Sequence, residues 1–138
     1  MGSKSERAPG RARAALAASI LVAVAAPSAF AEPIAARGER QFQLCYACHS
    51  TDPRDTGLPG PNLFGVVGRP AGAEPGFAYS PAMRTASRAG LVWTETELDA
   101  FLAGPAAMLP GVFMDFRGLN DAADRMAVIA YLKTRSRP

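Results

Sequence analysis

Two cysteines and one histidine lie close enough together in the sequence to form a single reactive or ligand-binding motif. Cys45 and Cys48 are the only cysteines among the 138 residues, and His49, directly after the second, is the only histidine. This C-x-x-C-H spacing is typical of covalent haem attachment. Each thiol can form a thioether with one vinyl group of the porphyrin, and the following residue is then held below the iron. The pattern predicts one haem c, anchored by Cys45 and Cys48, with His49 as a ligand of the iron.

Three other kinds of site could use these residues. A zinc site would need further cysteine or histidine ligands, which the chain lacks. A thioredoxin-like pair would need a βαβ setting, and no strand-rich region flanks the motif. A disulfide between Cys45 and Cys48 stays open, because exported proteins commonly form disulfides. The specificity of the complete motif favours haem.

The second axial ligand of the iron must come from another residue type, because a second histidine is absent. Methionine is the usual choice in high-potential carriers, since a neutral thioether favours Fe(II) over Fe(III). Met126 lies in a strong helical pattern and Met83 follows Pro81 early in an expected helix, so packing is the simpler role for both. Met108 and Met114 remain, and position alone does not separate them.

Residues 1–31 have the pattern of a cleavable secretory signal. A basic start precedes a 13-residue apolar run, Ala14 to Ala26, and the segment ends in Ala29-Phe30-Ala31. The run is short for a bilayer, which needs about 20 residues, although an uncleaved anchor is the alternative. We therefore expect export to the periplasm and one mature domain, 32–138. That part has 11 basic and 11 acidic residues, so its charge gives no reason to expect nucleic-acid binding.

The mature part is expected to be all-α, with helices at both ends and no strand pair. In the first helix, 35–44, Gly38 and Phe42 share a face, and Tyr131 in the last helix could pack on Gly38. We expect Asn120 to cap that last helix. Residues 94–97 form a capping box, and Gly104-Pro105 ends the helix that follows it. The loop 52–76 is rich in Pro and Gly, and a haem would organise it.

The order of these motifs resembles class I cytochromes c of the mitochondrial and proteobacterial type. The resemblance runs from about Gly38 to Arg135 and includes, after the haem motif, Gly60-Pro61-Asn62-Leu63, Gly68-Arg69, Phe77-Ala78-Tyr79-Ser80, Trp93, Pro105, Pro110-Gly111-x-x-Met114 and Ala130-Tyr131-Leu132. It implies the cytochrome c fold, in which a few helices wrap around one covalently bound haem and the terminal helices cross.

The resemblance also implies roles for single residues. Met114 ends the Pro-Gly-x-x-Met motif and would be the axial ligand in preference to Met108. The Pro61 carbonyl would accept a hydrogen bond from His49, which fixes the ring and raises its basicity. Tyr79 and Trp93 match residues that hydrogen-bond a haem propionate, although both could be ordinary core, and Arg69 matches one that balances this charge.

Other positions depart from the family pattern. Phe101 stands where many relatives have a tyrosine that reaches the methionine sulfur. Phe113 replaces a common lysine, and Leu44, Ala106 and Ala107 occupy positions of docking lysines in mitochondrial members. Electrostatic steering of partners should therefore be weak, and the docking face more apolar.

These features predict a periplasmic one-electron carrier that transforms no substrate. We expect a monomer that takes electrons from a quinol-oxidising complex or a dehydrogenase and passes them to an oxidase or reductase, in respiration or photosynthesis. Its membrane contact would be transient, or made through an uncleaved leader. One alternative is a dedicated electron-accepting subunit of a dehydrogenase complex. Another is a haem peroxidase or ligand sensor with a labile Met114 ligand.

Overall fold

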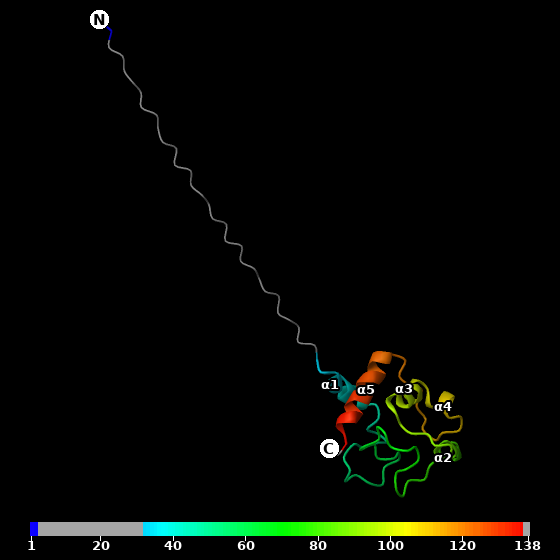
Figure 1. The fold of residues 1–138 in the computed structure, drawn as a ribbon. Helices are drawn as coiled ribbons and strands as arrows, with labels where there is room; N and C mark the ends of the chain where they lie inside the picture. Colours follow the sequence, from blue (N-terminus) through cyan, green and yellow to red (C-terminus); the bar gives the residue numbers. More distant parts are fainter. Residues whose placement is uncertain (3–31, 137–138) are drawn as a thin grey trace. The chain divides into compact units, whose positions relative to one another are not determined.

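A computed structural model describes residues 1–2 and 32–136. Apart from its first two residues, the expected secretory signal lies outside the described residues. The chain divides into two units, Met1–Phe30 and Ala31–Pro138, and all of the described helices belong to the second. None of the helices in the described part combines the length and apolar character needed to cross a membrane. The helices are α1 Ile34–Phe42, α2 Pro81–Arg88, α3 Glu95–Ala103, α4 Pro105–Met108 and α5 Ala122–Thr134 (Figure 1).

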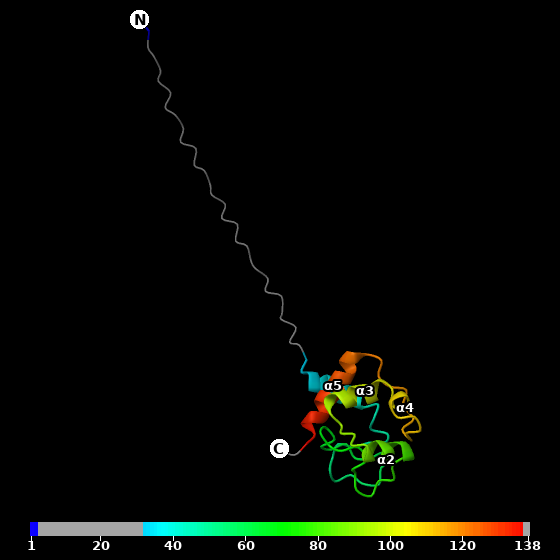
Figure 2. The ribbon, with the colours of Figure 1, turned by 45° about the vertical axis from the view of Figure 1, so that its right-hand side comes forward.

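The terminal helices α1 and α5 cross each other, as Figures 1 and 2 both show. Gly38 makes the crossing possible, because a Cβ atom at this position would lie 1.9 Å from the Ala127 carbonyl oxygen and 2.8 Å from Tyr131 Cβ. Beside this contact, the fully buried Phe42 ring lies 5.2 Å from the Tyr131 ring. The all-α class and the crossing of the terminal helices are thus as the sequence predicted.

Ion pairs tie the polar edges of this helix pair together. Arg37 of α1 donates to the Asp124 carboxylate of α5 at 2.6 Å, and Arg135 donates to Glu39 at 3.2 Å. The Arg135 guanidinium also lies 4.7 Å from the centre of the Tyr131 ring, where cation–π attraction adds to the packing. The two terminal helices of this unit are therefore held together by both apolar and charged contacts.

Side-chain caps set the start of α3 and of α5. The Thr94 hydroxyl accepts from the Glu97 backbone N–H at 3.1 Å, and α3 ends before Gly104, as expected from the motif. The cap of α5, however, is Asp121, whose carboxylate accepts from Ala123 N–H at 2.7 Å. The expectation of Asn120 at this position is wrong by one residue, because both residue types can cap and only the path of the chain selects between them.

The remainder of the unit is mostly loop. Between α1 and α2 the described backbone forms turns, and its only extended pairing is an isolated bridge from Pro70 to Val92, which follows α2. Ser80 caps α2 by accepting from Met83 N–H at 3.1 Å, and Met83 is the buried residue of this helix. α5 packs against both α1 and α3, whereas α2 packs on no other described helix. The loops and α2 instead surround a cavity.

Candidate functional site

A cavity of about 420 Å³ occupies the centre of the unit. Its walls come from the end of α1, the loops around residues 59–69 and 77–80, α3, the segment 112–116 and α5. Most of the lining side chains are apolar, and the only charged ones are Arg69 and Asp115. A mainly apolar pocket with a few polar groups is the usual site of a small-molecule or cofactor.

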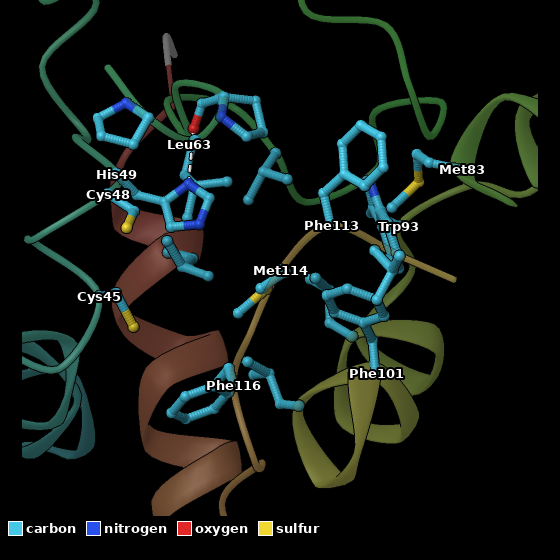
Figure 3. A pocket seen from close by; sticks show the side chains of 18 of the residues that line it. Cys45, Cys48, His49, Leu63, Met83, Trp93, Phe101, Phe113, Met114 and Phe116 are labelled. Atoms are coloured by element: carbon cyan, nitrogen blue, oxygen red, sulfur yellow. Dashed lines mark hydrogen bonds between the residues drawn. The ribbon is translucent and has the colours of Figure 1, made fainter. Parts of the chain in front are cut away.

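One wall carries the haem motif (Figure 3). After α1, the N–H groups of Cys48 and His49 both donate to the Cys45 carbonyl, at 3.0 and 2.9 Å. This turn brings both sulfurs and the imidazole to the same wall. Neither cysteine is in a disulfide, and burial, followed by the charge of Cys48, raises the pKa of Cys45 to about 11. Both sulfurs are thus free, and that of Cys45 is a protonated thiol at neutral pH.

The His49 ring is held in a defined orientation. Its Nδ1–H donates to the Pro61 carbonyl oxygen at 2.7 Å, because a carbonyl can only accept. The other ring nitrogen, Nε2, therefore keeps its lone pair. Burial lowers the pKa of His49, against the opposing effect of the Pro61 hydrogen bond, and so favours the neutral imidazole. This is the form that binds a metal.

Gly60 and Asn62 hold the loop that carries Pro61, and neither was singled out from the sequence as a site residue. A Cβ atom on Gly60 would lie 2.5 Å from His49 Cε1, so the ring leaves room only for glycine. The buried Asn62 amide donates to the carbonyls of Asp52 and Asp55 at 2.6 and 3.0 Å. The sequence contained a signal for both, since they flank Pro61 in the Gly-Pro-Asn-Leu motif.

Met114 lies on the opposite side of the cavity, next to Phe101 and Trp93 (Figure 3). Met108 does not line the cavity; it is half-buried and packs against the hydrophobic core. Met83 is buried and lines the cavity, in line with a packing role. Met126 was expected in the core, but it is 54% exposed, because its position on α5 faces away from α1 and α3. The helical pattern alone could not tell which face of α5 is covered.

Polar residues predicted to contact the propionates gather at one part of the wall. Arg69 donates to the Asn62 carbonyl at 2.7 Å and to the Glu74 carboxylate at 2.9 Å. The Tyr79 hydroxyl accepts from Glu74 N–H at 3.2 Å, which leaves its own proton for another acceptor. Burial is the main cause that raises the pKa of Tyr79. Glu74 was not anticipated from the sequence, and it means that Arg69 already has one carboxylate partner.

Trp93 also lines the cavity and is 7% exposed. Its ring lies 4.9 Å from that of Phe101, so the two aromatic side chains form one continuous part of the wall. Of the predicted cofactor-binding residues, the structure therefore brings Cys45, Cys48, Pro61, Arg69, Tyr79 and Trp93 to one cavity, together with both predicted iron ligands.

An all-α unit with a C-x-x-C-H turn at the wall of an apolar central cavity defines the class of monohaem c-type cytochromes. The profile of the cytochrome c family matches residues 35–136, and the chain belongs to this family.

The relatives are consistent with this assignment. Cytochrome c2 of Rhodomicrobium vannielii is 43% identical over 108 residues, which are 78% of this chain and 84% of the relative. The solved structure of cytochrome c2 from Rhodospirillum centenum superposes with a TM-score of 0.71 at 38% identity, covering 75% of this chain and 98% of that one. Cytochrome cH from Methylobacterium extorquens gives a TM-score of 0.65 at 42% identity, with 72% and 97% covered.

The cofactor of this family is a covalently bound haem c with its iron. The residues present fit that group. The cavity wall offers two free thiols, a buried imidazole whose Nε2 is unprotonated, and a thioether on the other side. Apolar side chains cover most of the remaining wall, and Arg69, which is paired with Glu74, lines it as well.

Proposed function

We propose that this cytochrome c is a periplasmic one-electron carrier whose haem is attached to Cys45 and Cys48 and whose iron is bound by His49 and Met114. The observation that carries the proposal is the position of these four side chains on the walls of one cavity. The similarity to cytochromes c2 supports the carrier function.

When bound, the haem supplies the Fe(III)/Fe(II) couple. His49 binds through Nε2, and the Pro61 carbonyl holds its ring in one orientation. The Met114 thioether is a neutral ligand and favours Fe(II). The apolar wall keeps water out and disfavours the additional positive charge of Fe(III), which raises the potential further. Arg69 and Tyr79 offer N–H and O–H donors to the acidic side chains of the porphyrin.

The redox partners follow from this chemistry. The donor is a quinol-oxidising complex or a dehydrogenase, and the acceptor is an oxidase or a reductase. The chain acts as a monomer and transforms no substrate. Residues 1–31 direct export and are removed. A dedicated subunit of a dehydrogenase complex is the second candidate, and it is favoured by exposed apolar side chains near the cavity: Leu44 is 62% exposed and Phe113 is 71% exposed.

Replacing single methionines tests the ligand assignment. Met114→Ala should abolish the weak long-wavelength absorption band of a methionine-bound Fe(III) haem and produce a high-spin spectrum. Met108→Ala is the matched control, because this methionine does not line the cavity, and it should retain the band. Loss of the band in Met108→Ala alone would overturn the assignment. A wild-type protein that is high-spin and binds carbon monoxide readily would instead be a peroxidase or ligand sensor.

Mass spectrometry of the natively matured protein tests attachment and export together. The peptide containing Cys45 and Cys48 should carry the mass of one haem, and the mature N-terminus should be Glu32. A peptide with two unmodified thiols would contradict the attachment. Co-purification with one dehydrogenase that survives high salt would favour the subunit over the free carrier.

A further inference from the structure

The His49 ring and the residue that follows it both bond to the loop 60–63. The ring donates through Nδ1–H to the Pro61 carbonyl at 2.7 Å. The next carbonyl along the chain, that of Ser50, accepts from the Leu63 N–H at 2.8 Å. How firmly this loop is held therefore decides where the hydrogen-bond acceptor of the imidazole lies.

Asn62 connects this loop to the turn formed by residues 52–55. It is 8% exposed, and its side-chain amide donates to the carbonyls of Asp52 and Asp55 at 2.6 and 3.0 Å. Because the amide is buried, water cannot readily replace these two acceptors, and a buried donor without a partner costs free energy. The loop that contains Asn62 should therefore shift if the turn opens.

Hydrogen bonds of the Ser50 hydroxyl close the same turn. The hydroxyl donates to the Asp55 carboxylate at 2.6 Å and accepts from the Asp52 N–H at 3.0 Å. Ser50 is buried, whereas Asp55 lies at the surface. A charged acceptor makes such a hydrogen bond shorter and stronger than one between neutral groups. The Asp55 carboxylate thus fixes the turn from outside, although it does not line the haem cavity.

We propose that Asp55 is a positioning residue for His49, the proposed ligand of the iron. By closing the turn to which Asn62 is bonded, its carboxylate keeps the Pro61 carbonyl within hydrogen-bonding distance of the ring. The proposal rests on the proposed function and extends it to a surface carboxylate. The hydrogen bond to Pro61 raises the basicity of the imidazole, and a more basic ligand favours Fe(III). Asp55 thus lowers the reduction potential of the haem without contacting it.

The single histidine of the chain allows a direct test on the haem-loaded protein. Isotope-labelled histidine gives one Nδ1–H signal in the NMR spectrum of the reduced protein, and its exchange with deuterated solvent reports how firmly the hydrogen bond to Pro61 is held. Asp55→Ala should accelerate this exchange about fivefold, the factor expected for one hydrogen bond, and should raise the reduction potential. The slowest amides of α5 should accelerate less, because they report global unfolding.

Further variants separate the contact from the charge. Asp55→Asn keeps an oxygen that can accept from Ser50, so it should restore most of the protection of the Nδ1 proton. Ser50→Ala should accelerate the exchange at least as much as Asp55→Ala, and the double variant should add nothing to Ser50→Ala, because both remove the same hydrogen bond. Asp52→Asn is the matched control: it removes a charge from the same turn, keeps an acceptor for the Arg54 N–H and should leave the exchange unchanged.

Three outcomes would overturn the positioning role. In Asp55→Ala the Nδ1 proton could exchange at the wild-type rate, or accelerate only in step with the α5 amides, which would leave Asp55 a role in stability alone. Asp52→Asn could accelerate the exchange equally, which would assign the effect to charge. Asp55→Asn could fail to restore protection. Failure of the proposed function is recognised separately, because the signals of His49 in the wild type would then lack the large ring-current shift that a haem imposes on its ligand.

Discussion

Two regions of the molecule differ in what fills them. Protein side chains fill the crossing of α1 and α5, whereas the central cavity is shaped for the haem. At the crossing, Ala127 and Tyr131 are at most 2% exposed and lie directly against Gly38 of the facing helix. At the cavity, Leu63, Val112 and Met114 are only half-buried and border about 420 Å³ of space. Side chains that border a space of this size depend on the group that fills it for their dispersion contacts. The first region is therefore stabilised by the protein alone, whereas the second needs its cofactor.

The backbone shows the same difference. α1 and α5 are regular helices with capped or ion-paired ends, but the described stretch between α1 and α2 consists of turns, and one of its residues, Pro70, forms an isolated bridge with Val92 beyond α2. Hydrogen bonds of turns and side chains, in place of a regular helix ladder, fix this segment, and the Asn62 amide takes part in three of them. A loop of this length in a compact domain needs something to pack against. The proposed attachment of the haem to Cys45 and Cys48, next to the end of α1, would supply it.

The largest expected effect comes from preventing haem attachment. In the double variant Cys45→Ala, Cys48→Ala, the cavity wall should lose its contacts, and the small domain should lose most of its structure. Circular dichroism should show a largely unfolded chain at 25 °C. A well-folded apoprotein with full helical signal would contradict the view that one half depends on the cofactor.

The next effect is expected at the crossing itself. Gly38→Ala would place a methyl group 1.9 Å from the Ala127 carbonyl oxygen, and neither helix backbone can move without losing the packing of Phe42. We expect a loss of more than about 4 kcal/mol in the free energy of unfolding, measured by denaturant titration of the holoprotein. A loss below about 1 kcal/mol would show that the helices can separate at little cost.

Gly60→Ala places a comparable change in the cavity region. Its Cβ atom would lie 2.5 Å from His49 Cε1, so the imidazole must shift away from the Pro61 carbonyl. We expect a destabilisation of about 1–3 kcal/mol, as in other overpacked sites, together with an altered haem spectrum. Gly38→Ala should lower the stability but leave the haem spectrum unchanged as long as the protein stays folded. The same change of the haem spectrum in both variants would contradict the distinction between the two regions.

The smallest effect is expected where the two regions meet. Tyr46 lies within the haem motif, and its hydroxyl hydrogen-bonds the Tyr131 hydroxyl of α5 at 3.1 Å. This hydrogen bond is the main cause that raises the pKa of Tyr46 to about 12, from a usual value of 10.0. Tyr46→Phe should destabilise the holoprotein by at most about 1 kcal/mol at neutral pH.

The pH dependence of that effect has a defined sign. Because the pKa of Tyr46 is higher in the folded than in the unfolded chain, its contribution is complete below pH 10 and is lost as the pH rises towards 12. The stabilities of wild type and Tyr46→Phe, measured by thermal unfolding, should therefore converge over this range. A difference that grows with pH would contradict the hydrogen bond as its cause.

Much of this protein was determined by local sequence. The proposed haem attachment depends on the spacing of Cys45, Cys48 and His49, which is a property of five consecutive residues. The capping of α3 by Thr94 and its end at Gly104 also depend on neighbours along the chain. Gly38 and Phe42, four residues apart, were enough to predict the packing of the terminal helices, because a helix places such residues on one face.

Only the tertiary structure decided which residues meet across the loops. From the sequence we predicted that Met126 is buried, but it is exposed in the structure. The sequence also gave no reason to connect Arg69 with Glu74, which the structure pairs at 2.9 Å. From position alone, Met108 and Met114 were equivalent, and folding brings Met114 to the cavity wall. These outcomes depend on how separate segments pack around a common space. Residues that are neighbours in the sequence do not determine how far apart such segments lie in space, so these contacts depend on the tertiary structure.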